Sequence, residues 1–558
     1  MVLDLETLLA ADAILLTFVV IGLGMALGRL HLGPVPVGST AGVLVTGLVF
    51  GHLGFLPVPS LTTIGFTLFI FCVGVQAGPR FFNVLIEDGR RYVTLALLAA
   101  LTGSGLALGL GYLIAAEPGM TVGMLAGALT STPTLVGAQD AIRSGRVELP
   151  AGLDAAAVLS NVGVAYAITY LFGTIGILFA IRLLPRVVGL DLQAEAAKLA
   201  RQQGMVDDEA PIASPSLPLV RAYRLPDSLP AEGLSIHELQ ARSEDGFAIL
   251  RIRRGEAVIE PTGDFLLLPG DVVSGIATLR ANIEAQTTLG QEVLDPELLN
   301  FKVTSREIVV TSQRWAGRNL GSLEMPTRFG CFADRLTRSG FAVPFSPATV
   351  LARADRLRVT GEERRLRELA EEIGYVEREV EASDSLTLAF GIALGLLIGT
   401  IVVQIGGLQV GLGAAGGLLL VGILVGFARS VHPTFGLMPP AARAVLMDLG
   451  LMLFMAGIGL GAGGGIVDAL ARVGPQLFLA GVVVTLTPIV LLYAVGRGLM
   501  KMNPVLLLGA ICGAMTSTPA LAVVNAVAGN GMAALGYAGT YTFANVFLTF
   551  AGTILAAW

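Results

Sequence analysis

Two long stretches of this sequence are nearly free of charged residues, and this limits the possible fold more than any other feature. The 558-residue chain has 36 lysines and arginines and 42 aspartates and glutamates, and 53 of these charges lie in residues 187–383. The other 361 positions hold only 25 charges, far below the quarter that is usual in soluble proteins. We therefore expect an α-helical polytopic membrane protein with one soluble insert.

Each charge-poor half contains six apolar runs, and a helix needs roughly 20 apolar residues to cross a bilayer. The fifth run of each half is interrupted by Thr-Ser-Thr-Pro, and a proline breaks the backbone ladder of a spanning helix. We expect five transmembrane helices in each half, plus one re-entrant broken helix that enters and leaves on the same side. The runs lie near 12–30, 36–54, 61–79, 92–116, 120–139, 153–181, 385–404, 408–428, 444–466, 475–496, 503–527 and 533–557.

The placement of lysine and arginine predicts the orientation, because cytoplasmic flanks of membrane helices carry more positive charge than outer flanks. With five crossings in each half, ten basic residues flank helices on one side and three on the other. Both termini then lie outside and the insert 187–383 is cytoplasmic. The ten are Arg29, Arg80, Arg90, Arg91, Arg182, Arg186, Arg429, Arg443, Arg497 and Lys501, and the three are Arg143, Arg146 and Arg472.

The two halves of the sequence are copies of one another. GALTSTPTL at 127–135 recurs as GAMTSTPAL at 513–521 with seven of nine positions identical, and Gly65–Gly78 aligns with Gly450–Gly463. Because an odd number of crossings turns the second copy over, we expect two inverted repeats. Inverted repeats build many secondary transporters, whose sites lie near the membrane midplane where broken helices meet.

The two Thr-Ser-Thr-Pro segments form the main candidate site. Helices are expected to start at Pro133 and Pro519, with Thr132 and Thr518 as N-caps. A helix N-terminus presents unpaired N–H groups and a positive dipole end, which suit a carboxylate. Alternatively, the hydroxyls bond only to the local backbone. The candidate substrate-binding residues are Thr130, Ser131, Thr132, Pro133, Thr516, Ser517, Thr518 and Pro519.

A few other polar residues in or beside the apolar runs form a second set of candidates. Such residues are costly inside a membrane and often functional, although asparagine and glutamine also join helices to one another. Arg80 is either an anchor at the cytoplasmic boundary or a contact for a substrate carboxylate. The set is Gln76, Arg80, Gln139, Asn161, Asn525 and Asn545.

The insert is interpreted as a linker and two similar modules. Residues 187–215 are polar and contain prolines, as linkers do, whereas 216–290 and 291–383 each combine short β-like runs with a helix-like run. No phosphate-binding loop, Ser/His/Asp arrangement or metal-ligand cluster appears, so no catalysis, metal or cofactor is expected. A net charge of −6 argues against nucleic-acid binding. The flanking domains are the membrane repeats 1–186 and 384–558.

The whole chain resembles the aspartate:alanine exchanger family of bacterial inner-membrane transporters. The resemblance rests on FIFCVGVQAGPRFF (69–82), GALTSTPTLVGAQ (127–139), VAYAITYLFGTIGILF (164–179) and GAMTSTPAL (513–521). The two modules are similar to the TrkA-C regulator domains that occur between the halves of this family. The family's Thr-Pro motif falls on Gly127, Thr130, Thr132, Pro133 and Leu135, and on Gly513, Thr516, Thr518, Pro519 and Leu521.

The resemblance implies a secondary antiporter that exchanges L-aspartate for L-alanine by alternating access in a bacterial inner membrane, with periplasmic termini. It also implies a homodimer and a small regulatory ligand at the TrkA-C-like modules. Three other functions stay open on the residues alone. They are a potassium channel or ion transporter gated by the modules, an exporter of other dicarboxylates, and a sensor that binds a solute without moving it.

Overall fold

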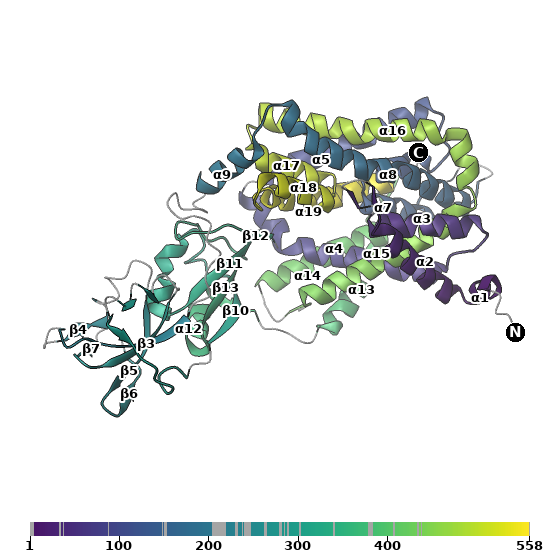
Figure 1. The fold of residues 1–558 in the computed structure, drawn as a ribbon. Helices are drawn as coiled ribbons and strands as arrows, with labels where there is room; N and C mark the ends of the chain where they lie inside the picture. Colours follow the sequence, from purple (N-terminus) through teal and green to yellow (C-terminus); the bar gives the residue numbers. More distant parts are fainter. Residues whose placement is uncertain are drawn as a thin grey trace. The chain divides into compact units, whose positions relative to one another are not determined.

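The chain folds into two compact units, one helical and one built on β-sheets (Figure 1). The helical unit comprises Met1–Ala196 and Val380–Trp558, and the sheet unit comprises Ala197–Glu379. The part of the predicted linker after residue 202 lies outside the described residues. The computed structural model describes residues 5–32, 35–36, 38–87, 89–147, 149, 153–202, 219–228, 233–236, 238, 247–261, 265–277, 282–283, 285–286, 289–300, 303–338, 341–377, 383–405, 408–431, 435–436 and 438–556.

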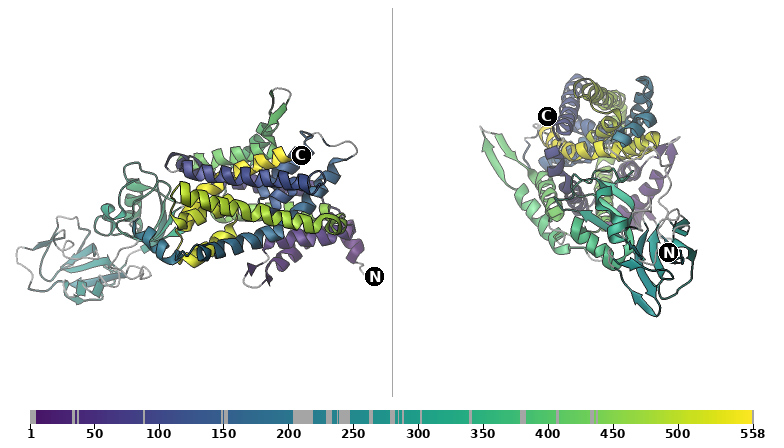
Figure 2. Two further views of the ribbon diagram at one scale, coloured as in Figure 1. Left: turned by 90° about the horizontal axis from the view of Figure 1, so that it is seen from above. Right: turned by 90° about the vertical axis from the view of Figure 1, so that its left-hand side faces the viewer.

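The helical unit contains the same order of elements twice. After a short α1 (Leu5–Ala11), the first half has α2 (Ala13–Gly28), β1 (His31–Leu32), β2 (Val35–Pro36), α3 (Ser39–His52), α4 (Pro59–Glu87), α5 (Gly89–Leu113), α6 (Met120–Ala128), α7 (Thr132–Arg143) and α8 (Ala155–Val187). The second half has α13 (Ser385–Gly399), β15 (Val402–Ile405), β16 (Leu408–Gly411), α14 (Gly413–Val431), α15 (Pro440–Gly463), α16 (Ile466–Ala494), α17 (Pro504–Ala514), α18 (Thr518–Ala528) and α19 (Ala533–Leu555). Figure 2 shows the β15–β16 hairpin projecting beyond the neighbouring helices.

Six helices of the described chain are long and apolar enough to cross a membrane, and they include α4, α5 and α8 in the first half and α15, α16 and α19 in the second. The first two helices of the first half are shorter: α2 has 16 residues and α3 has 14. At 1.5 Å per residue, α2 is about 24 Å long, less than a bilayer core of about 30 Å. Five crossings per half therefore stay a prediction.

Glycines let the central helices of the two halves touch along their backbones. A Cβ added to Gly47 of α3 would lie 3.0 Å from Cα of Gly459 in α15, and one added to Gly74 of α4 would lie 2.9 Å from Cα of Gly422 in α14. Small residues at such crossings let membrane helices gain close van der Waals contact. The halves are therefore joined through α3, α4, α14 and α15, which lie together in Figure 1.

Helices α4 and α15 occupy matching places in the two halves and cross at matching residues. A Cβ on Gly65 would lie 2.6 Å from the Gly450 carbonyl oxygen, and a Cβ on Gly450 would lie 2.8 Å from the Gly65 carbonyl oxygen. These two glycines align in the sequence repeat. The contact between the halves is therefore reciprocal at this point.

The sheet unit contains two five-stranded antiparallel sheets with the same strand order. The first module's order is β6-β5-β8-β3-β9 and the second module's is β12-β11-β13-β10-β14. Helix α12 (Glu363–Ile373) lies between strands β13 and β14 of the second sheet in the chain. The strands are β3 (Leu219–Arg224), β5 (Ala248–Arg254), β6 (Ala257–Ile259), β8 (Val272–Ala277), β9 (Gln291–Glu292), β10 (Val303–Val310), β11 (Phe332–Arg338), β12 (Phe341–Val343), β13 (Arg356–Glu362) and β14 (Gly374–Val376), with a separate pair β4 (Leu234–Ser235) and β7 (Leu266–Leu267).

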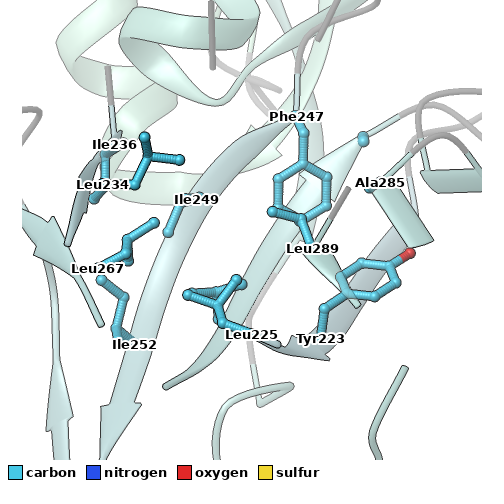
Figure 3. Close-up of a cluster of buried hydrophobic side chains, with 12 residues drawn as sticks. Tyr223, Leu225, Leu234, Ile236, Phe247, Ile249, Ile252, Leu267, Ala285 and Leu289 are labelled. Atoms are coloured by element: carbon cyan, nitrogen blue, oxygen red, sulfur yellow. The ribbon is translucent and has the colours of Figure 1, made fainter. Parts of the chain in front are cut away.

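Each face of the first sheet packs against apolar side chains. On one face Tyr223 and Phe247 pack edge to face with ring centroids 5.7 Å apart, within the cluster of buried residues in Figure 3. On the other face, Ala248 and Leu250 pack with Phe332 of the second module. The alternation of apolar side chains along β5 therefore serves both the module's own core and the contact between the modules.

Candidate functional site

Each Thr-Ser-Thr-Pro segment forms a break between two short helices. In the first half α6 ends at Ala128 and α7 begins at Thr132. The N–H of Thr130 donates to the carbonyl of Gly127 at 3.0 Å, and the N–H of Ser131 donates to that of Ala126 at 2.8 Å. This pair of bonds is the Schellman ending of a helix. The second half repeats it, with Thr516 bonded to Gly513 and Ser517 bonded to Cys512.

The threonine two residues after the end of α6, and its counterpart after α17, have an unusual backbone conformation. Thr130 has φ 51° and Thr516 has φ 52°. A β-branched residue is rare in this left-handed region, and holding one there costs on the order of 1–3 kcal/mol. Glycine is the usual residue at this position of a Schellman ending. A strained threonine in both halves indicates that its side chain is needed there.

The hydroxyls of these two threonines join the two breaks to each other. Thr130 Oγ1 donates to the Met515 carbonyl at 3.1 Å, and Thr516 Oγ1 donates to the Thr130 carbonyl at 3.3 Å. Carbonyls at the end of a helix have no partner within the helix. Each break therefore supplies the hydrogen bonds that the other one needs, in the interior of the helical unit.

Serine, not threonine, caps the helix that follows each break. Ser131 Oγ accepts from the N–H of Thr134 at 3.3 Å and Ser517 Oγ accepts from the N–H of Ala520 at 3.4 Å. The expected N-caps Thr132 and Thr518 are therefore wrong by one residue. The reason is that each serine still has an extended backbone, whereas the threonine after it is already helical.

The N-termini of α7 and α18 offer few free N–H groups. Pro133 has none, and those of Thr134 and Leu135 are taken by the Ser131 hydroxyl and carbonyl. Among the described residues, the N–H of Thr132 has no hydrogen bond, and the same pattern holds at Thr518. A ligand at either break would therefore meet one N–H group, the threonine hydroxyls and the positive end of a helix dipole.

The two breaks differ in exposure. Thr132 is buried, and α7 is buried along nearly its whole length. Thr518 and Pro519 are exposed, and α18 buries only one face. The two copies of the motif are therefore in different environments, although their local backbones match.

Two pairs of tyrosines that were not predicted from the sequence lie beside the breaks. On α8 the rings of Tyr166 and Tyr170 are 5.0 Å apart, and on α19 the rings of Tyr537 and Tyr541 are also 5.0 Å apart. Tyr537 forms a hydrogen bond of 2.9 Å with Thr518 Oγ1. The sequence does contain a pattern that marks these tyrosines, because YAITY at 166–170 recurs as YAGTY at 537–541.

Gln139 and Asn525 occupy matching positions, each nine residues after the first threonine of its motif. The side-chain carbonyl oxygen of each is buried and lacks a hydrogen-bond partner among the described residues. A buried polar atom without a partner is costly, and native proteins rarely keep one without a reason. These two predicted residues lie on the broken helices and offer free acceptors there.

The remaining candidates have other surroundings. Asn545 is buried on α19 and donates to the Tyr541 carbonyl at 2.7 Å. Asn161 donates to the Pro118 carbonyl at 3.0 Å, which joins α8 to the loop before α6 rather than to a break. Gln76 is half-buried on α4, and no described contact joins it to a break. The side chain of Arg80 lies outside the described residues.

Two charged residues near the end of α7, Asp140 and Arg146, form an ion pair. Arg146 bonds to Asp140, and Gly413 at the start of α14 lies against both side chains. The matching positions after α18 are Ala526 and Met532, so this pair has no counterpart in the second half. The pair therefore ties one broken helix, and not the other, to the opposite half.

Two neighbouring arginines of the first module, Arg253 and Arg254, form ion pairs with carboxylates. Arg253 bonds to Asp295 at 2.6 Å and to Glu297 at 2.8 Å, and Arg254 bonds to Asp271 at 2.7 Å. The hydrogen bond from Arg253 holds the pKa of the Asp295 carboxyl below its usual range. These ion pairs therefore join neighbouring elements of the module.

Two family models match the chain. A model described as a predicted permease membrane region, Asp-Al_Ex, matches residues 16–186 and again residues 387–557. A TrkA-C domain model matches residues 220–280 and 306–374. Both matches agree with the family resemblance that the sequence motifs indicate. No solved structure matches the chain significantly.

Proposed function

Because this chain belongs to the Asp-Al_Ex permease family and is a multi-pass membrane transporter, we propose that it is a secondary antiporter of small carboxylates and amino acids. L-aspartate and L-alanine are the expected pair, exchanged by alternating access at the two Thr-Ser-Thr-Pro breaks. One observation carries the proposal. The breaks, 386 residues apart in the sequence, hydrogen-bond to each other inside the helical unit.

The chemistry of the breaks suits a carboxylate. The N-termini of α7 and α18 each direct a partial positive charge and a free N–H toward the break, so a small anion is attracted without a buried lysine or arginine. The Thr132 hydroxyl adds a donor that can rotate toward the ligand. The hydroxyls of Thr130, Thr516 and Thr518 would have to leave their present partners to do the same. Ser131 and Ser517 hold the helix ends in place, and Pro133 and Pro519 keep them from extending backward.

The two repeats are proposed to be inverted, with five crossings each. Thr62 of α4 lies against Gly457 of α15, whereas Gly65, one turn later, lies against Gly450. The contact moves forward along α4 and backward along α15, so these matching helices are antiparallel. Repeats related in this way face opposite sides of the membrane.

The same topology places both termini outside and the insert in the cytoplasm of a bacterial inner membrane. In support, the ion pair between Glu117 and Arg472, at 3.0 Å, joins the loop before α6 to the first turns of α16, and this topology puts both on the outer side. A Glu117→Cys variant should react with an impermeant maleimide in intact cells, and a Gly189→Cys variant only after permeabilisation. The reverse pattern would contradict the orientation.

The difference in exposure between the breaks supports alternating access. The first break is buried and tied by the Asp140–Arg146 pair, and the second is exposed at Thr518. A carrier opens one side at a time, so this asymmetry is expected of one of its two states. Gln139 and Asn525, with their free acceptors, are proposed to contact the solute or an accompanying cation two turns beyond the breaks.

The remaining parts follow from this assignment. Residues 1–186 and 384–558 are the transport repeats, 187–215 is the linker, and 216–290 and 291–383 are regulatory modules that take a small ligand. A homodimer is proposed for the full chain, and the mass of the detergent-solubilised protein measured by light scattering tests this. Gln76, Arg80, Asn161 and Asn545 are kept as secondary candidates for contact with the solute.

Transport in proteoliposomes tests the proposal. Vesicles that contain the purified chain and are preloaded with alanine or aspartate should take up labelled aspartate rapidly, whereas empty vesicles should not. Equal uptake by empty vesicles would contradict exchange, and a potassium current far above carrier turnover would indicate a channel. Unlabelled dicarboxylates and amino acids added in competition then define the substrate class.

A double variant tests the site itself. Thr132→Val with Thr518→Val removes two hydroxyls at the helix starts and keeps the side-chain shape. We expect aspartate exchange to fall at least tenfold, which corresponds to about 1.4 kcal/mol, while the elution volume and melting temperature stay near those of the unmodified chain. Normal exchange kinetics in this variant would remove the breaks from the binding site.

A further inference from the structure

Tyr166 and Tyr537 occupy matching positions on α8 and α19, but their hydroxyls have different partners. Tyr537 forms a hydrogen bond of 2.9 Å with Thr518, the second threonine of its motif. Tyr166 lies beside Thr132, the matching threonine of the first motif. Even so, the Tyr166 hydroxyl is buried and makes no hydrogen bond of normal geometry with any described residue. The repeat therefore presents one tyrosine in a paired state and one in an unpaired state.

The unpaired Tyr166 hydroxyl is fully buried, where a polar group without a partner is costly. The Tyr166 side chain is 0% exposed, and Thr132 beside it is also buried. A phenol is expected to find a partner when it is buried, and loss of that partner costs the full desolvation of the group. The sequence nevertheless keeps tyrosine here, where phenylalanine would fill the same space. A partner that arrives from outside the chain accounts for this choice.

The neighbouring groups indicate what that partner is. Tyr166 OH is a donor at neutral pH, and it lies next to the N-terminus of α7 with its free Thr132 N–H. The phenol and this N–H group are both hydrogen-bond donors without a partner among the described residues. A ligand that satisfies them together must carry acceptors and negative charge, and a phenol donates a short, strong hydrogen bond to a carboxylate.

We propose that Tyr166 is a substrate-binding residue that donates to the carboxylate held at the first break, and that Tyr537 takes the same role at the second break. The inference rests on the proposed carboxylate exchange and adds a specificity-determining residue to it. In the second break the Thr518–Tyr537 bond occupies the donors until a substrate displaces it. In the first break the donors are already free.

The hydroxyls of Tyr537 and Tyr166 therefore correspond to two stages of substrate binding, before and after a break closes. Where the break is exposed, the hydroxyls of Thr518 and Tyr537 satisfy each other. Where the break is buried, the Tyr166 hydroxyl lies beside Thr132 without a hydrogen-bond partner among the described residues and awaits an acceptor. Closure of a break around a carboxylate would replace the threonine–tyrosine bond with bonds to the ligand.

The test compares Tyr166→Phe with Tyr170→Phe, which removes a hydroxyl one turn later on the same helix and keeps the ring contact. In preloaded proteoliposomes, Tyr166→Phe should raise the KM for aspartate roughly 10- to 100-fold, the range expected for a lost hydrogen bond to a charged group. Tyr170→Phe should change it less than threefold. Tyr537→Phe should also raise the KM, since both breaks serve the same cycle.

A stability measurement separates binding from structure. Because Tyr166→Phe removes a buried hydroxyl without a partner, its melting temperature without substrate should equal or exceed that of the unmodified chain. The rise in melting temperature on adding aspartate should be smaller in Tyr166→Phe than in the unmodified chain. A lower melting temperature without substrate, or an unchanged KM, would overturn the inference. Unmodified chain that exchanges no carboxylate at all would overturn both this inference and the proposed function.

Discussion

The hydroxyl of Thr516 donates a hydrogen bond to the backbone carbonyl of Thr130, its counterpart in the other half of the chain, at 3.3 Å. The Thr130 hydroxyl returns a bond to Met515 at 3.1 Å. Both threonines have positive φ values that glycine would adopt without strain. The hydroxyl therefore outweighs the backbone cost at each break, and the two helix ends depend on each other.

This dependence predicts different results for serine and valine at the same position. Thr130→Ser keeps the hydroxyl and relieves β-branching, so stability and exchange should stay close to those of the unmodified chain. Thr130→Val keeps the strain and leaves the Met515 carbonyl unpaired in the interior, which should cost about 1–3 kcal/mol. Thermal unfolding in detergent and exchange rates measure both effects. Equal losses in the two variants would contradict a role for the hydroxyl.

The exposure of the breaks predicts which of them reacts with a thiol reagent. Thr518→Cys should be labelled rapidly by N-ethylmaleimide, because Thr518 is exposed, and Thr132→Cys should be labelled slowly. The native cysteines Cys72, Cys331 and Cys512 are buried and should give little background. Mass spectrometry of the labelled protein gives the rates. Equal rates at the two positions would argue that the breaks share one environment.

The sequence predicted the broken helices because Pro133 and Pro519 are strong local signals that hardly depend on tertiary contacts. It did not predict that Ser131 and Ser517 cap α7 and α18, since serine and threonine are both good caps and differ here only in backbone conformation. A shift of one residue is within the normal uncertainty of helix ends. The chemistry of the segment was therefore predictable, but its geometry was not.

Tyr166 and Tyr537 were missed for a different reason. Each lies in the apolar helix that follows the broken helix, and helical periodicity does not say which neighbour a buried tyrosine faces. The repeated pattern YAITY and YAGTY was the available signal. In contrast, Gln139 and Asn525 were selected for their polarity alone, and the structure places both on the broken helices with free acceptors.

The Asp140–Arg146 pair predicts a contact that can be measured between α7 and α14. Gly413 has φ 66°, and a side chain there would collide with both members of the pair. Gly413→Ala should therefore displace the pair and lower the melting temperature, as Asp140→Asn should. Because the three residues share one contact, the Gly413→Ala/Asp140→Asn double variant should lose less stability than the sum of the losses in the two single variants. Additive losses would show that Gly413 and the pair act independently.

The two modules repeat one buried ion pair, and its setting predicts a difference in strength. Asp355 is 1% exposed and pairs with Arg338, whose side chain is 18% exposed, whereas Asp271 is 3% exposed and pairs with Arg254 at 36%. Removing one partner of a buried ion pair costs roughly 3–5 kcal/mol, and this cost is smaller where solvent reaches the pair. Asp355→Ala should therefore destabilise its module more than Asp271→Ala does, as measured by limited proteolysis in urea. The opposite order would contradict the argument from burial.

The Cys331 thiol predicts a pH dependence that is confined to alkaline conditions. Burial raises the pKa of this thiol to about 12 from a usual value of 9.0, and its Sγ donates to the Phe329 carbonyl at 3.3 Å. The folded state thus binds the proton more tightly than the unfolded state does. Stability from this group is present below pH 9 and is lost as pH rises toward 12. When unfolding in urea is monitored by limited proteolysis, the Cys331→Ala variant should show a weaker alkaline decline in stability. In a separate test, iodoacetamide at pH 8 should modify Cys331 only in the unfolded protein. An identical alkaline decline in the variant would show that other groups cause it.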